Sequence, residues 1–136
     1  MELKDIRYGM SLEVPLGYDR AVERAREELA KEGFGVLTEI DVKATLKKKL
    51  DVDFRPYIIL GACNPPLAHQ ALSAEPDIGL LLPCNVIVYA TDDPDRTLVA
   101  AIDPVTQLEI TGNKQIGPVA EQVRAKIERV LRGMIA

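Results

Sequence analysis

The chain has 136 residues, 47% of them apolar and 28% charged, which favours one globular α/β-type domain over residues 1–136. Its net charge of −4 disfavours attraction to a phosphate backbone. Aromatic residues make up 4% of the chain and tryptophan is absent, so a surface that stacks nucleic-acid bases is not expected.

Two sequence features predict a cytoplasmic protein that does not enter a membrane. No apolar run approaches the roughly 20 residues of a membrane-spanning helix. The first residues lack the charged-then-apolar pattern of a secretory signal. The two cysteines, Cys63 and Cys84, are therefore expected to be free thiols.

The first part of the chain predicts two half-buried strands and two helices. Apolar and polar residues alternate over residues 8–14 and 34–40. Residues 18–31 repeat apolar side chains at helical spacing, and Asp41 can cap a short helix over residues 42–50. The residues expected to share one face of their strand are Tyr8, Met10, Leu12 and Val14 in the first, and Phe34, Val36, Thr38 and Ile40 in the second.

The middle of the chain predicts a buried strand followed by a helix. Residues 56–63 form a nearly continuous apolar run, which indicates a central strand buried on both faces. Asn64 is suited to cap the next helix, and Pro65 to open it. A single helical turn is expected from Pro76.

The last part predicts a hairpin and a long helix. Strands are expected over residues 85–90 and 97–102, then a helical turn after Asp103, then a helix over residues 117–132. The whole order predicts an α+β fold, with two long helices packed on one face of a mostly antiparallel sheet.

The dipeptide Cys-Asn occurs twice, at Cys63-Asn64 and Cys84-Asn85. A thiol at a helix N-terminus can have its pKa lowered by the helix dipole and by free N–H donors, although two prolines after Asn64 remove two of those donors. If the two strands are neighbours, both thiols lie near the same sheet end. The alternative is that both cysteines are small buried apolar residues, as free cysteines often are.

His69 is the only histidine and lies six residues after Cys63. A Cys-His nucleophile pair needs contact between the two side chains and an orienting acceptor, so an ordinary surface or structural role is favoured for His69. Cys63, Cys84 and His69 are the candidate ligands for a soft metal, but no pair of closely spaced cysteines supports a zinc site. No Gly-rich phosphate-binding loop follows a predicted strand, and the sequence leaves any cofactor unknown.

A basic segment follows Asp41. Lys43 and Lys47 are four residues apart and share one face of the short helix, which could hold an anion. Lysines at the end of a helix are ordinarily solvated and favoured by its dipole, but Lys43 lies near the opposite, positive end. Asp41 and Lys43 are therefore included among the candidate ligand-binding residues.

Four blocks of sequence resemble one known family. They are Asp41–Leu50, Ile59–Pro66, Gly79–Val86 and Ile102–Pro104, and they occur in the order seen in the bacterial and archaeal domain of unknown function number 302. The resemblance implies a TATA-binding-protein-like β-α-β(4)-α arrangement and carries no established activity. Its motif residues fall here on Asp41, Lys43, Thr45, Gly61, Cys63, Asn64, Pro65, Pro83, Cys84, Asn85, Asp103 and Pro104.

Three hypotheses about function remain open from the sequence. The first is a domain that binds a small molecule or a soft metal. Its expected ligand-binding residues are Cys63, Asn64, Cys84, Asn85, Lys43 and Asp41. The second is a thiol enzyme that uses Cys63 as its nucleophile. The third is a structural or assembly role with inert cysteines, as a homodimer, which is the commonest oligomer.

Overall fold

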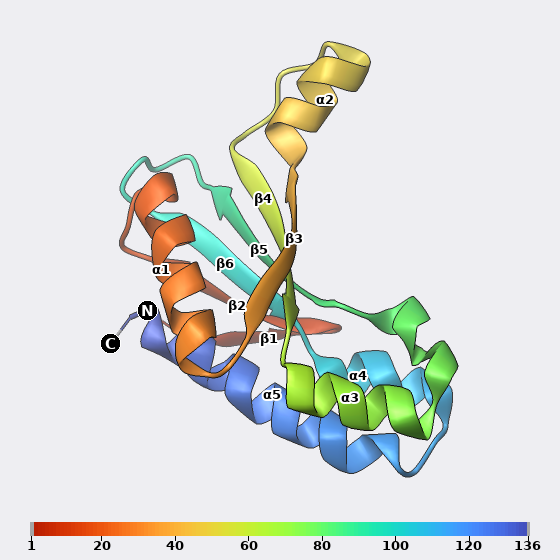
Figure 1. The fold of residues 1–136 in the computed structure, drawn as a ribbon. Coiled ribbons are helices and arrows are strands. Elements are labelled where there is room, and N and C mark those ends of the chain that lie inside the picture. Colours follow the sequence, from red (N-terminus) through yellow and green to blue (C-terminus); the bar gives the residue numbers. More distant parts are fainter. Residues whose placement is uncertain (1, 136) are drawn as a thin grey trace.

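In the computed structural model, which describes residues 2–135, one six-stranded sheet carries helices on one face (Figure 1). The strands lie in the order β1-β2-β6-β5-β4-β3, and each neighbouring pair is antiparallel. Their bounds are β1 Lys4–Ile6, β2 Gly9–Val14, β3 Gly35–Asp41, β4 Tyr57–Cys63, β5 Cys84–Ala90 and β6 Thr97–Ile102. The predicted α+β fold is confirmed. Met1 and Ala136, which the single-domain prediction includes, lie outside the described residues.

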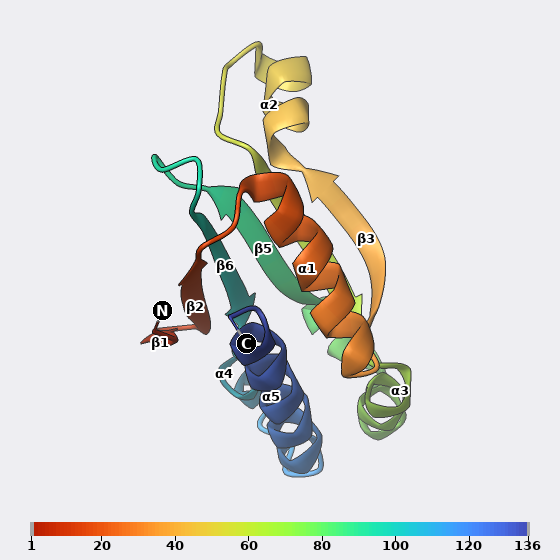
Figure 2. The same cartoon turned by 90° about the vertical axis from the view of Figure 1, so that its left-hand side faces the viewer.

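Two long helices, α1 (Tyr18–Lys31) and α5 (Ile116–Gly133), pack on the same face of the sheet (Figure 2). The shorter helices are α2 (Val42–Leu50), α3 (Pro65–Ala74), the 3₁₀ helix η1 (Pro76–Leu81), α4 (Pro104–Leu108) and the 3₁₀ helix η2 (Glu109–Thr111). Helix α3 lies beside α5 at one end of the sheet, whereas α2 projects from the other end (Figure 1). None of the helices in residues 2–135 is both long and apolar enough to cross a membrane.

The core lies between the sheet and the two long helices. Alternate residues of the strands point toward the helices and are fully buried, as the two-residue period of a strand requires. The largest of them are Met10, Leu12, Val14, Leu60, Val86, Val88 and Val99. From the helices, Leu29 of α1 and Ile127 and Leu131 of α5 close the core. On each helix the buried residues form one stripe, because they recur at the 3.6-residue period of an α-helix.

The other side of the sheet, which we call the open sheet face, is uncovered in the described part of the chain. Register assigns to it the strand residues between the core positions. They include Ser11, Tyr57, Ile59, Asn85, Ile87, Tyr89, Leu98 and Ala100. The predicted burial of residues 56–63 on both faces is therefore wrong, because helices cover β4 on one face only.

A bulge in β3 corrects the predicted facing of residues 34–40. Val36 pairs with Ala62 and Thr38 pairs with Gly61, so Leu37 is an extra residue in β3. One extra residue reverses the facing of the residues after it. Val36 therefore points toward the helices, whereas Thr38 lies on the opposite side with Gly61.

The N-terminal region also differs from the prediction. Strand β1 was not predicted, because its three residues are all exposed and carry no alternating apolar pattern. Tyr8 lies in the turn between β1 and β2, and 62% of its surface is exposed, so it does not share the buried side of Met10, Leu12 and Val14.

A buried carboxylate joins the C-terminal part of α1 to the end of α5. Burial opposes ionisation of Glu28, but hydrogen bonds from Lys31 at 2.6 Å and Arg24 at 3.1 Å prevail and hold the pKa of Glu28 below its usual value. Arg24 also donates to the carbonyl of Gly133 at 2.8 Å. Arg24, held in place by Glu28, therefore ties α1 to the C-terminal end of α5.

Candidate functional site

A cavity of about 320 Å³ lies at the end of the sheet, between β3, β4 and β5 on one side and α3, η1, α4 and α5 on the other. We call it the sheet-end cavity. Most of its wall is apolar. It is lined by Phe34, Leu37, Thr38, Ala62, Cys63, Asn64, Leu67, Ala68, Ala71, Leu72, Gly79, Leu82, Pro83, Cys84, Leu108, Val119 and Val123.

Small side chains explain why this space is not filled. Ala62 on the sheet and Ala68 and Ala71 on α3 face the cavity, and Gly79 contributes no side chain at all. Apolar interiors otherwise pack to the density of organic crystals. The hollow is therefore specified by the choice of small residues at positions where Leu or Val would close it.

Cys84 lies inside the wall of this cavity. Its residue surface is 6% exposed, and burial, with a smaller contribution from Cys63, raises its pKa to about 11. The only polar side-chain contact of its sulfur within residues 2–135 is with Gln107 Oε1, at 4.0 Å. At neutral pH Cys84 is therefore a protonated thiol, because the thiolate would be desolvated without a compensating charge.

Cys63 lines the same cavity and is half-buried. Ala62 is the direct partner of Cys84 in the sheet, which places Cys63 one residue further along β4. A negative charge on Cys63 would raise the pKa of Cys84, so the two sulfurs are within electrostatic reach. The structure thus brings the two cysteines of the repeated dipeptide to one end of the sheet.

Asn64 is held by two structural hydrogen bonds. Its side-chain oxygen accepts from the backbone N–H of Leu67 at 3.5 Å, which caps α3, and its side-chain nitrogen donates to the carbonyl of Glu32 at 3.2 Å. Asn64 therefore ties the N-terminus of α3 to the residue that follows α1. It lines the cavity, but its side-chain nitrogen and oxygen each already have a structural partner.

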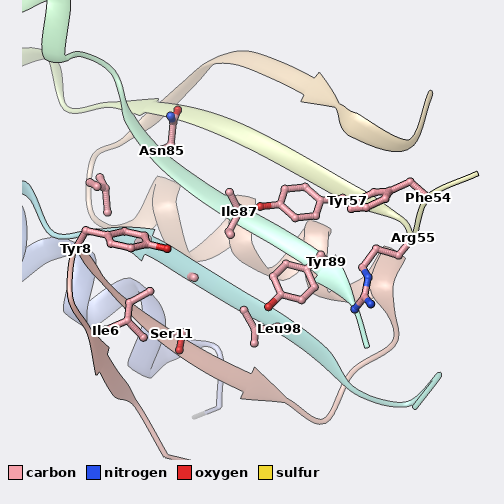
Figure 3. A pocket seen from close by; sticks show the side chains of 13 residues that line it. Ile6, Tyr8, Ser11, Phe54, Arg55, Tyr57, Asn85, Ile87, Tyr89 and Leu98 are labelled. Carbon is pink, nitrogen blue, oxygen red and sulfur yellow. The ribbon is translucent and has the colours of Figure 1, made fainter. Parts of the chain in front are cut away.

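Asn85 does not join this cavity. Cys84 points toward the helices, and consecutive strand residues point to opposite faces, so Asn85 lies on the open sheet face (Figure 3). The prediction that both Cys-Asn pairs contribute side chains to one pocket is therefore corrected for Asn85.

Asp41 and Lys43 lie at the opposite end of the sheet from the cysteines. Asp41 pairs with Ile58, whereas Cys63 lies five residues further along β4, about 16 Å away at the rise of a strand. Asp41 accepts from the backbone N–H of Ala44 at 2.9 Å, and Lys43 donates to the carbonyl of Phe54 at 3.0 Å. Both side chains thus hold α2 and the segment after it, and their predicted place beside Cys63 is wrong.

His69 is exposed on α3 and is not among the residues that line the sheet-end cavity. This position agrees with the ordinary surface role favoured for His69, whereas the alternative, a place beside Cys63 as its nucleophile partner or as a metal ligand, is not seen. Within residues 2–135 no group of three or more histidine, cysteine or carboxylate side chains has the geometry to hold a metal ion. Any metal at Cys63 and Cys84 would have two protein ligands.

Other residues singled out by the sequence have evident structural roles. Gly61 has no room for a side chain, because a Cβ there would overlap Thr38 Oγ1 and lie 2.8 Å from Pro83 Cγ. Asp103 caps α4 through the N–H of Val105 at 2.9 Å and accepts from Arg124 Nε at 3.2 Å.

The helical walls of the cavity were not predicted from the sequence. Ala68, Ala71 and Leu72 on α3 and Val119 and Val123 on α5 line it. The sequence signal for this wall is the pair of small residues on the inner side of α3, Ala68 and Ala71. Such a pair leaves a gap when the sheet residue opposite, here Ala62, is also small.

Comparison with known proteins places the chain in a family. No curated protein matches it. Among solved structures it is similar to the crystal structure of the uncharacterized conserved protein DUF302 from Bacillus stearothermophilus, with 27% sequence identity and a TM-score of 0.85. That match covers 94% of this chain and 98% of the other. The model of the family described as Domain of unknown function DUF302 matches residues 10–134, so the chain belongs to that family.

Proposed function

We propose that this protein binds a small, mainly apolar molecule in the sheet-end cavity. The observation that carries the proposal is the cavity itself, whose volume of about 320 Å³ lies at the lower limit of small-molecule sites. That volume equals roughly ten water molecules at their share of liquid volume, so the ligand is compact, with about ten non-hydrogen atoms.

The polar groups of the wall also favour an apolar ligand. Among the described residues, no buried side-chain nitrogen or oxygen lacks a hydrogen-bond partner. A site built for a polar ligand leaves donors or acceptors waiting for it, because an unpaired polar group in a dry wall is costly. The two thiols, Cys63 and Cys84, are soft and polarisable and suit contact with an aromatic or sulfur-containing molecule.

Titration with indole, which has nine non-hydrogen atoms, tests the proposal. We expect indole to shift the backbone amide NMR signals of residues 62–64 and 67–72, with a Kd of about 0.1–1 mM, roughly 0.5 kcal/mol per ligand atom. The variant Ala68→Phe fills the cavity and removes these shifts. Ala125→Phe, on an exposed position of α5, is the matched control and keeps them. Shifts that persist in Ala68→Phe, or that scatter over the surface, refute the proposal.

A second candidate is a site for a soft monovalent cation such as Cu(I). It is supported by the two thiols that line one cavity within electrostatic reach of each other. The raised pKa of Cys84 opposes it, since the metal must displace a tightly held proton. Anaerobic Cu(I) competition separates the candidates. Cys63→Ala and Cys84→Ala each weaken a two-thiolate site at least 100-fold, but leave the Kd for indole within about threefold.

The thiol-enzyme alternative has less support. His69 lies outside the cavity, so Cys63 has no histidine base there.

The two free thiols support a cytoplasmic location, where the environment keeps cysteines reduced.

A further inference from the structure

The open sheet face is apolar, although helices cover only the other side of the sheet. An antiparallel sheet with one solvated face ordinarily alternates apolar and polar residues. Here β4, β5 and β6 instead place large apolar side chains on both faces. Those on the open side are Tyr57, Ile59, Ile87, Tyr89 and Leu98. This departure from the normal pattern indicates that something covers the open sheet face.

A row of aromatic rings continues from this face into the segment that carries α2. The rings of Tyr57 and Tyr89 stack with centroids 5.2 Å apart, and Phe54 lies 6.1 Å from Tyr57. Arg55 sits over the ring of Tyr89 at 5.7 Å (Figure 3). We call residues 41–56 the α2 arm. The open sheet face and the arm thus form one continuous surface.

The α2 arm makes few contacts with its own chain. It projects beyond the sheet (Figure 1), and none of the described residues of α2 is buried. It nevertheless exposes Leu50 by 66%, Val52 by 43% and Phe54 by 41%. A nine-residue helix is marginal in water without packing on an apolar face. The arm therefore has the properties of an element that packs on a partner.

We propose that the open sheet face and the α2 arm form the interface between two copies of this chain. Charge favours this partner. The arm contains five basic and three acidic residues, a net charge of +2, whereas the whole chain carries −4, which leaves −6 on the rest. The arm of one copy is thus attracted to the body of the other, while the acidic body disfavours a nucleic acid.

The area of the surface also fits a dimer. Six strands spaced about 4.8 Å apart and about 20 Å long present roughly 600 Å² of projected face. A stable interface needs roughly 800 Å² per partner. The sheet face alone falls short, and one side of α2, about 13 Å by 10 Å, brings the total close to this requirement.

Sedimentation equilibrium of the full chain tests the proposal. We expect the wild type to have twice the mass of one chain at micromolar concentration. Ile87→Glu places a carboxylate at the centre of the interface, and Leu50→Glu places one on the arm. Each raises the dimer Kd at least about 30-fold, the effect of losing a hot-spot residue. The matched control is Leu80→Glu, since Leu80 is 90% exposed on η1, away from the face, and it leaves the Kd unchanged.

Circular dichroism of each variant checks that it folds. Should Ile87→Glu unfold, Tyr8→Glu decides, because Tyr8 and Ile87 line one hollow on the open sheet face and Tyr8 is 62% exposed. A monomeric wild type at about 100 µM, a concentration well above a micromolar Kd, overturns the proposal, as does an unchanged Kd in folded Ile87→Glu or Tyr8→Glu. An unchanged Kd in Leu50→Glu alone overturns the role of the arm. If the wild type is a monomer that binds duplex DNA, and Ile87→Glu abolishes that binding, the partner is a nucleic acid and the dimer is refuted.

Discussion

The buried thiol of Cys84 gives the sharpest test of the candidate site. Cys63→Ala leaves Cys84 as the only cysteine and removes the smaller of the two causes that raise its pKa, while burial, the larger cause, remains. A rise from the ordinary value of 9.0 to about 11 is close to two units. At pH 7.5 the full rise, as in the wild type, lowers the thiolate fraction from about 1 in 30 to about 1 in 3,000. Because Cys63→Ala retains only the larger cause, its alkylation slows by up to roughly 100-fold before any steric hindrance.

The assay is the rate of reaction with iodoacetamide between pH 7 and 11, followed by mass spectrometry. We expect the rate for Cys63→Ala to rise through the whole range, without the plateau near pH 10 that an ordinary thiol shows. In 6 M guanidinium chloride the same thiol should recover the ordinary rate. A folded Cys84 that reacts within tenfold of a small thiol at pH 7.5 would refute the argument.

The same shift predicts alkaline sensitivity. The folded-state pKa of Cys84 is raised, so its contribution to stability is complete below pH 9 and is lost as pH rises through about 11. Two units correspond to about 3 kcal/mol. The variant Cys84→Ala lacks this pH dependence. Urea unfolding of both proteins at pH 8 and pH 10.5 measures the difference, and parallel losses in the two proteins would contradict it.

Three further changes test the structural framework of the site by chemical denaturation. Gly61→Ala should cost about 1–3 kcal/mol, because its Cβ overlaps Thr38 Oγ1, and the added change Thr38→Ala should recover part of that loss; no loss in the single variant contradicts the overlap. Asn64→Ala should cost about 1–2 kcal/mol, since it removes the cap of α3 and the bond to Glu32 O, and a loss below about 0.3 kcal/mol contradicts this role. The lowered pKa of Glu28 means that its stabilisation is present above its unfolded-state pKa and is lost as pH falls through its folded-state pKa. The difference in unfolding free energy between the wild type and Glu28→Gln should therefore shrink from pH 7 to pH 3, and a constant difference would exclude this linkage.

The sequence predicted the elements better than their facing. Helical spacing identified α1 and α5, because each buries one stripe. The alternation in residues 34–40 predicted the wrong facing for the residues after Leu37. The bulge there comes from how β3 pairs with β4 and leaves no local signal in the sequence. Strand β1 carries no apolar pattern and is fixed by its pairing with β2.

The candidate site was partly predictable. That Cys84 and Asn85 face opposite sides follows from strand geometry alone, and the sequence already contained this information. The meeting of Cys63 and Cys84 depends on β4 and β5 being neighbours in the sheet, which local sequence does not determine. The cavity also needed α3 and α5 to converge on small residues, and that depends on tertiary packing.

The pairing of β2 with β6 has a consequence for how the chain folds. Gly9–Val14 lies against Thr97–Ile102, so partners more than 80 residues apart in sequence form adjacent strands. Closing so long a loop is entropically costly and slows folding relative to proteins with local contacts. During synthesis β2 must wait until β6 has left the ribosome, and until then Met10, Leu12 and Val14 have no strand on that side. The apolar side of β2 therefore stays without its neighbouring strand until most of the chain has been made, and an unpaired apolar strand of this kind is prone to aggregation.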